Sequence, residues 1–158
     1  MQRRSFVLSL AALSAAAFPM RGAWAADDEF PFSLTDEEWR DRLDQKAYIV
    51  LRKKGTERPY TSPLNEEKRA GVFHCAACDQ ALFVSDTKYD SHTGWPSFYD
   101  FIPGALGTEE DLTLGMMRIE VHCSNCGGHQ GHVFEDGPAP TGLRYCINGI
   151  AMRFEPSA

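Results

Sequence analysis

Five cysteines carry most of the reactive chemistry in this chain of 158 residues. Four of them form two Cys-x-x-Cys pairs, Cys75 with Cys78 and Cys123 with Cys126, while Cys146 has no neighbour of its kind. Each pair turns two sulfurs toward one point, and two pairs complete the tetrahedral thiolate set that zinc prefers. Because zinc has no redox chemistry of its own, the spacing predicts one structural zinc ion that pins together two distant parts of a sheet.

Two alternatives to the metal site stay open at this point. An oxidising compartment would favour disulfides, and a single pair can act as a thioredoxin-like redox site where a helix N-terminus lowers the thiol pKa. Cys75 and Cys123 instead end strand-like runs. That position favours the metal site over the redox site.

Cys146 lies in the apolar run GLRYCINGIAMRF, where an inert buried cysteine is the ordinary interpretation. Its neighbours indicate another. Arg144, two residues earlier, points to the same face of a strand, and a nearby cation favours the nucleophilic thiolate over the thiol. His129 and His132 flank Gly131 in a glycine-rich segment and form a candidate proton-handling or ligand pair.

Trp95 is a candidate binding surface because the glycine and proline on either side can hold its indole exposed on a loop. The competing interpretation makes Trp95 and Phe98 ordinary core residues. The combination of Trp95 with Cys146, Arg144 and His132 favours an enzyme over a zinc-held β module that binds a partner without catalysis.

The elements expected to position these residues are mostly short strands. SLTDEEWRDRL predicts a helix capped by Thr35, with Glu38 three residues on, and one helical turn is expected at 65–69. Strands are expected at 72–74, 81–85, 117–121, 132–134, 143–147 and 150–154. Asn148-Gly149 between two apolar runs predicts a hairpin. The expected fold class is all-β and mainly antiparallel, with small helices on its N-terminal side.

Residues 1–25 have the layout of an export signal: a basic start with Arg3 and Arg4, an apolar stretch, and a small-residue cleavage site ending at Ala25. The paired arginines indicate the twin-arginine route, with the general secretory route and a retained anchor as alternatives. We expect 26–32 to be a linker and 33–156 the domain. The protein would be exported to the bacterial periplasm, with no stable membrane insertion after signal cleavage.

The chain is acidic, with a formal charge of −6 at pH 7. The signal holds three of the 16 basic residues and none of the 22 acidic ones, so its removal leaves −9. Nucleic-acid phosphates need a basic surface. The charge therefore argues against nucleic acid as a partner.

Five segments, read in order, resemble the B-type methionine sulfoxide reductases: GTERPYTSP, HCAAC, LFVSDTKYDSHTGWPSF, CSNCGGHQGHVFEDGP and GLRYCIN. The resemblance covers residues 34–154. Members of that family reduce the R epimer of methionine sulfoxide in peptides and proteins. The resemblance implies the family's β-tent, in which two antiparallel sheets hold a structural zinc ion away from the active site, and a role in repairing oxidised exported proteins.

The resemblance also implies roles for matching residues. Cys146 would be the nucleophile that attacks the sulfoxide sulfur and becomes a sulfenic acid. His132 is then the leading candidate acid, with His129 beside it. Asn148 would join the same polar network, whether or not it also begins a turn.

A second group would hold the thiolate and the substrate. Arg144 would stabilise the Cys146 thiolate while held by Asp136, which could otherwise simply shape a turn. Trp95 would receive the S-methyl group of the substrate on its indole face. Phe134 and Asp136 complete the implied substrate-binding set.

The departures from the family pattern are equally informative. Thr93 stands where many members have a cysteine that resolves the sulfenic acid by forming a disulfide. With the other cysteines assigned to zinc, Cys146 has no internal partner, so we expect an external thiol reductant, thioredoxin-like or other. Gln130 replaces a usual leucine and Gly149 a usual serine, with effects that the sequence leaves open.

Overall fold

The computed structural model describes residues 30–158. The predicted export signal and the first part of the predicted linker lie outside these residues. Within the described part of the chain, no helix is long and apolar enough to cross a membrane. From the end of the linker, the backbone N–H of Phe32 donates to the carbonyl of Asn125 at 2.8 Å, beside the second cysteine pair.

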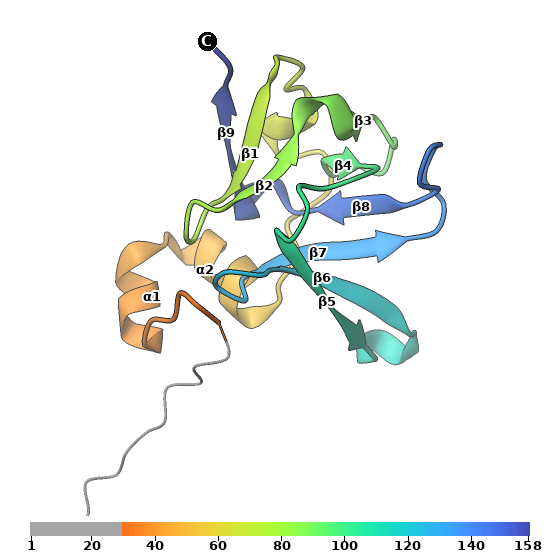
Figure 1. The fold of residues 1–158 in the computed structure, drawn as a ribbon. Helices are drawn as coiled ribbons and strands as arrows, with labels where there is room; N and C mark the ends of the chain where they lie inside the picture. Colours follow the sequence, from red (N-terminus) through yellow and green to blue (C-terminus); the bar gives the residue numbers. More distant parts are fainter. Residues whose placement is uncertain (1–29) are drawn as a thin grey trace, which may run out of the picture.

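Two short helices open the domain (Figure 1). Helix α1 (Asp36–Arg42) begins with the expected capping box, in which Thr35 and Glu38 each accept from the other's backbone. Helix α2 (Gln45–Lys53) is a second small helix on the N-terminal side, as the fold class predicted, but its bounds were not located because its apolar run AYIVL also fits a buried strand. Asp44 caps its N-terminus, and the helix packs against strand β7 and the turn η4.

The strands form two antiparallel sheets, as the sequence predicted. The three-stranded sheet has the order β2-β1-β9, with β1 (Gly71–Cys75), β2 (Ala81–Val84) and β9 (Met152–Pro156). The six-stranded sheet has the order β3-β4-β8-β7-β6-β5, with β3 (Lys88–Tyr89), β4 (Ser97–Phe98), β5 (Leu106–Asp111), β6 (Arg118–Cys123), β7 (His129–Phe134) and β8 (Arg144–Ile147). Short 3₁₀ turns connect them: η1 (Pro63–Asn65), η2 (Ser85–Thr87), η3 (Thr113–Gly115) and η4 (Gly149–Ala151).

Aromatic rings fill the space between the two sheets. Phe98 from the six-stranded sheet stacks on Phe83 at 4.1 Å between ring centroids and meets Phe73 edge-on at 5.0 Å. All three side chains are fully buried. Each buried aromatic ring removes a large apolar area from water, so this cluster ties the sheets together and confirms Phe98 as core.

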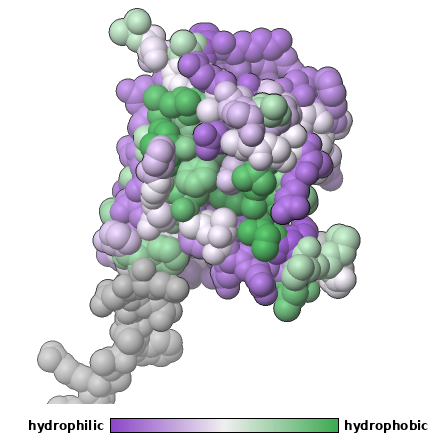
Figure 2. All heavy atoms as spheres, turned by 45° about the vertical axis from the view of Figure 1, so that its right-hand side comes forward, coloured by the Kyte–Doolittle hydropathy of each residue, from purple (hydrophilic) through white to green (hydrophobic). Residues whose placement is uncertain are grey.

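Apolar side chains also reach the surface. Leu112, Met116 and Met117, in the turn between β5 and β6, are all more than half exposed. Figure 2 shows apolar surface in the middle of one face of the molecule, bordered by hydrophilic residues.

The predicted Asn148-Gly149 hairpin is wrong. Strands β8 and β9 belong to different sheets, and the turn η4 redirects the chain between them. Gly149 is needed for space: a Cβ there would lie 1.9 Å from Ser62 Oγ and 2.5 Å from Ser62 Cβ. The helical turn expected at 65–69 is also wrong, because the 3₁₀ turn η1 lies at Pro63–Asn65.

The contact between Gly149 and Ser62 predicts a coupled pair of substitutions. Gly149→Ser should lower the free energy of unfolding by about 1–3 kcal/mol, because the added atoms overlap Ser62. Ser62→Gly should also destabilise, because Ser62 Oγ accepts from the backbone N–H of Leu64 at 3.1 Å. In the double variant Ser62→Gly/Gly149→Ser, urea denaturation should show a smaller loss than the two single losses summed. Additive losses would mean that the two positions do not clash.

Candidate active site

Cys146 occupies the middle of the six-stranded sheet. In β8 it lies opposite Ser97 of β4 on one side and His132 of β7 on the other. Its half-buried thiol faces a chain of hydroxyls: Thr93 Oγ1 is 3.9 Å from the sulfur, and Ser91 Oγ links Thr93 Oγ1 at 2.8 Å to Ser97 Oγ at 2.7 Å. The position predicted to lack a helper cysteine therefore places a hydroxyl beside the Cys146 thiol.

Burial and charge act against each other at this thiol. Burial raises the pKa of Cys146 above its ordinary value, while the hydrogen bond from Thr93 and the positive charge of Arg144 act to lower it. Arg144 thus acts to lower the pKa of Cys146 as expected, but burial raises that pKa by more. The resting residue favours the thiol, contrary to what the neighbouring cation alone suggests.

Arg144 is held at the site by two contacts. Its Nε and Nη2 donate to the two carboxylate oxygens of Asp136, each at 2.8 Å, and its guanidinium lies 4.4 Å above the centre of the Phe134 ring. The predicted pairing of Arg144 with Asp136 is present. Phe134 and Asp136, predicted to bind substrate, hold Arg144 in this structure. An open hollow of about 410 Å³ is lined by Thr93, Asp136 and Arg144 among others.

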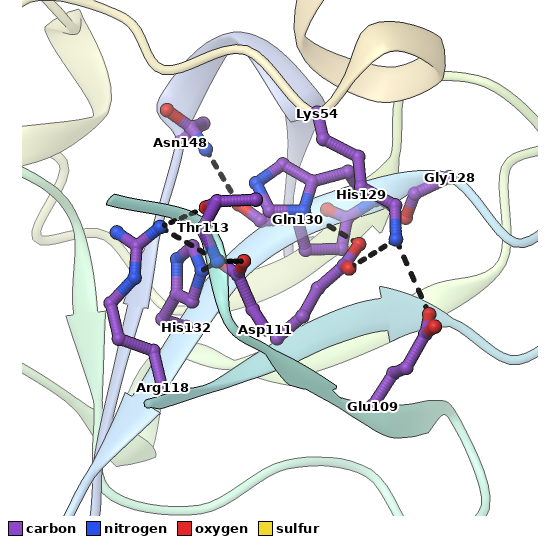
Figure 3. A network of polar contacts seen from close by, with 11 residues as sticks. Lys54, Glu109, Asp111, Thr113, Arg118, Gly128, His129, Gln130, His132 and Asn148 are labelled. Atoms are coloured by element: carbon purple, nitrogen blue, oxygen red, sulfur yellow. Dashed lines mark hydrogen bonds and ion pairs between the residues drawn. The ribbon is translucent and has the colours of Figure 1, made fainter. Parts of the chain in front are cut away.

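His132 is paired with a carboxylate that sequence reasoning missed. Its Nε2 lies 2.7 Å from Asp111 Oδ2, which also accepts from Arg118 Nη2 at 2.7 Å (Figure 3). Burial lowers the pKa of the His132 imidazole, and the contact with Asp111 opposes that shift. If the neutral ring donates from Nε2 to Asp111, Nδ1 is the nitrogen left to exchange a proton elsewhere.

His129 belongs to a second, more enclosed pair. Its Nδ1 lies 2.8 Å from Glu120 Oε1, and Glu120 Oε2 pairs with Lys54 Nζ at 2.6 Å (Figure 3). The rings of His129 and His132 meet edge-on with centroids 5.5 Å apart. The two histidines are therefore neighbours as predicted, but His129 is only 2% exposed and stands behind His132.

Asn148 and Trp95 are joined through Glu57, another residue that sequence reasoning missed. The backbone N–H of Glu57 donates to Asn148 Oδ1 at 3.0 Å, and the Glu57 carbonyl accepts from Trp95 Nε1 at 3.1 Å. The Glu57 carboxylate accepts the backbone N–H groups of Gly149 and Ile150. Asn148 is buried and bonded to backbone groups, so it holds Glu57, whose carbonyl accepts from the indole.

Trp95 is half-buried on its loop and lines a hollow of about 400 Å³ with Tyr60, His92 and Pro96. A larger hollow of about 940 Å³ lies between α2, residues 56–64 and residues 149–152. None of Cys146, His132 and Trp95 lines it. The size of a hollow therefore does not mark the predicted site residues, and Trp95 and Arg144 line two different hollows.

The four remaining cysteines form one compact cluster. Their sulfurs all lie within 4.8 Å of one another, with Cys75 3.8 Å from Cys126 and Cys78 3.6 Å from Cys123. A tetrahedron with Zn–S bonds of 2.3 Å puts sulfurs about 3.8 Å apart, so the set fits zinc. None of the five cysteines is in a disulfide. The cluster joins the end of β1 to the end of β6, which are in different sheets.

Comparison with known proteins agrees with this arrangement. The SelR domain family matches residues 43–156. Peptide methionine sulfoxide reductases MsrB are similar over 77% of the chain: those of Agrobacterium fabrum at 54% identity, Methanosarcina barkeri at 57% and Pseudomonas putida at 56%, with 91%, 86% and 92% of each relative covered. The chain belongs to the SelR family. The SelR match contains every candidate site residue described above.

The residues of the SelR site that the sequence did not reveal are acidic. Asp111 reaches His132 across β6, and its run of three acids reads as a solvated face. Glu57 lies in an irregular segment with no periodic pattern. Glu120 did carry a usable signal, since it is an acid in the middle of the apolar alternation RIEVHC and is 3% exposed.

The balance of burial and charge at Cys146 predicts its titration. Because burial raises the pKa of the thiol, alkylation of Cys146 by iodoacetamide should still accelerate as pH rises through about 8.5, the ordinary cysteine value. Arg144→Met should move the midpoint further upward by removing the opposing charge. Arg40→Met, an exposed arginine paired with Asp36 on α1, is the matched control and should leave it unchanged. Equal midpoints for wild type and Arg144→Met, measured on the Cys146 peptide by mass spectrometry, would contradict this balance.

Proposed function

We propose that this protein reduces the R epimer of methionine sulfoxide in peptides and proteins, with Cys146 as the nucleophile. The observation that carries the proposal is the position of Cys146, directly opposite His132 and two residues from Arg144 on one sheet. Membership of the SelR family and the names of its MsrB relatives support the same activity. An inert core cysteine has no need of these partners.

The first half-reaction joins the thiol and the sulfoxide. The Cys146 sulfur attacks the sulfoxide sulfur and forms a transient S–S bond. The oxygen is then transferred from the methionine sulfur to the Cys146 sulfur, and the S–S bond breaks to release methionine, which leaves Cys146 as a sulfenic acid. Because the resting thiol keeps its proton, that proton must move to the oxygen as the bonds change. His132, opposite Cys146 and held by Asp111, is placed to pass it on.

Trp95 and Arg144 have complementary parts in binding. The indole offers a flat apolar wall for the S-methyl group, and its loop is fixed by the hydrogen bond to Glu57. Arg144 and the hydroxyl of Thr93 favour the thiolate as it forms. An apolar wall on one side and proton donors on the other distinguish the two epimers, because a sulfoxide sulfur is chiral. Phe134 and Asp136 act by orienting Arg144.

The second half-reaction requires thiols from outside the chain. Thr93 Oγ1 lies 3.9 Å from the Cys146 sulfur, at the position of the usual resolving cysteine, and the other four cysteines lie together in the metal cluster. One external thiol, from a thioredoxin-like protein or a small reductant, attacks the sulfenic sulfur, releasing water and forming a mixed disulfide. A second thiol frees Cys146 and leaves as the oxidised partner.

Zinc would be held by Cys75, Cys78, Cys123 and Cys126, where it supplies structural cross-linking and no redox chemistry. We further propose export to the bacterial periplasm and repair of oxidised exported proteins there. The basic and apolar layout of residues 1–25 supports this. The acidic body argues against nucleic acid as a partner.

A direct assay tests the activity and the nucleophile together. Peptides that carry the R or the S epimer of methionine sulfoxide are offered with dithiothreitol to wild type and to Cys146→Ser. The R peptide alone should be reduced, and the substitution should abolish turnover, because a hydroxyl cannot take up the oxygen as a sulfenic acid. Cys78→Ser is not a suitable control, since it changes the metal set. Thr93→Ser keeps the hydroxyl and should retain activity. Reduction by Cys146→Ser at the wild-type rate would end the proposal.

The contact between Asp111 and His132 predicts a positioning effect. Asp111→Asn should lower kcat by roughly 10- to 100-fold with a nearly unchanged KM, because the amide no longer fixes the ring but leaves the binding surface intact. The acidic limb of the pH–rate profile should also move to lower pH, since Asp111 raises the pKa of His132 and its loss lets that pKa fall further. Glu110→Gln, an exposed acid next to it on β5, is the control. A kcat equal to wild type would remove Asp111 from the mechanism.

A further inference from the structure

Gln130, where the family resemblance gives a leucine, extends from β7 into the cysteine cluster. Its side chain is fully buried. Nε2 lies 3.5 Å from Cys75 Sγ and 3.2 Å from the carbonyl oxygen of Gly128. The strand that carries His132 thus also touches one of the four clustered sulfurs.

The orientation of this amide follows from its surroundings. Nε2 faces two acceptors, a sulfur and a carbonyl oxygen, whereas a flipped amide would place Oε1 against both of them. In the orientation found, Oε1 is buried with no hydrogen-bond partner among the described residues. A buried unpaired oxygen is costly. A leucine at this position would have no unpaired oxygen. The N–H···S contact to Cys75 is the interaction that can offset the cost of the unpaired Gln130 oxygen.

A four-thiolate zinc site is stabilised by hydrogen-bond donors such as the Gln130 amide. Four thiolates around one divalent cation leave an excess of negative charge in a mostly buried place, and hydrogen bonds to the sulfurs spread that charge. The backbone N–H of Gln80 donates to the Cys78 sulfur, and the backbone N–H of Asn125 donates to the Cys123 sulfur. Cys75, which is fully buried, receives the side-chain amide of Gln130.

We propose that Gln130 is a positioning residue of the metal centre: its N–H···S bond stabilises the Cys75 thiolate in its zinc-bound position and strengthens metal retention. The inference rests on the zinc assignment made under the proposed function. Gln130 also links the centre to the reactive strand. Its carbonyl accepts both the backbone N–H and Nδ2 of Asn148, at 2.8 and 3.0 Å, two residues beyond Cys146 (Figure 3).

Cobalt substitution reads out this hydrogen bond without any activity assay. The full chain is produced with Co²⁺ in place of zinc, and the sulfur-to-cobalt charge-transfer band is recorded. An N–H···S bond lowers the energy of the sulfur lone pairs and raises the energy of the band. Gln130→Leu should therefore move the band to lower energy. It should also weaken metal retention, measured by release of Co²⁺ to a chromogenic chelator, by roughly 10- to 100-fold.

Two further variants isolate the cause. Gln130→Met, apolar and of similar length, should reproduce both effects and guards against a packing fault peculiar to leucine. Gln80→Leu is the matched control, because its amide lies beside the centre but bonds only the carbonyl of Ala105 and the hydroxyl of Ser124. It should leave the band in place.

The outcomes separate the two claims. A four-thiolate cobalt spectrum that is identical in wild type, Gln130→Leu and Gln130→Met, with equal metal release, overturns the role of Gln130 and leaves the metal assignment standing. Wild-type protein that takes up neither zinc nor cobalt overturns the metal assignment, and the inference with it.

Discussion

Four cysteine sulfurs that meet between the two sheets are the contact on which the rest of the structure depends. One pair begins at the last residue of β1 and the other at the last residue of β6, so the cluster lies where two sheets that share no strand meet. The stacked rings of Phe83 and Phe98 hold the same two sheets elsewhere. With the sheets fixed, β8 lies between β4 and β7, and Cys146 is the cysteine left outside the cluster.

Two opposing effects act on the pKa of the Cys146 thiol. Burial keeps the sulfur out of water and raises its pKa, while Arg144 and Thr93 favour the charged form. In the proposed reaction, a thiol that stays protonated at rest would supply the proton that the sulfoxide oxygen needs. Each polar group around it has its own anchor, as Asp136 holds Arg144 and Asp111 holds His132.

Local patterns in the sequence predicted what depends on neighbouring residues. The cysteine pairs, the capping box at Thr35 and most strands were found because spacing and alternation determine them. The Asn148-Gly149 hairpin failed because β8 pairs with β4 and β7 whereas β9 pairs with β1, and these pairings depend on strands distant in sequence. Asp111 was missed for a similar reason: its partner His132 lies two strands away, and only the sheet order brings them together.

The central claim is that four of the five cysteine sulfurs bind the metal and that only the fifth, Cys146, reacts with the substrate. It is tested most directly by oxidising the protein with one equivalent of methionine-R-sulfoxide, without reductant, in the presence of dimedone. Mass spectrometry and metal analysis should then show the sulfenic-acid adduct on Cys146 alone, with one zinc retained per chain. A disulfide between Cys146 and any of the clustered cysteines, with zinc released, would contradict it.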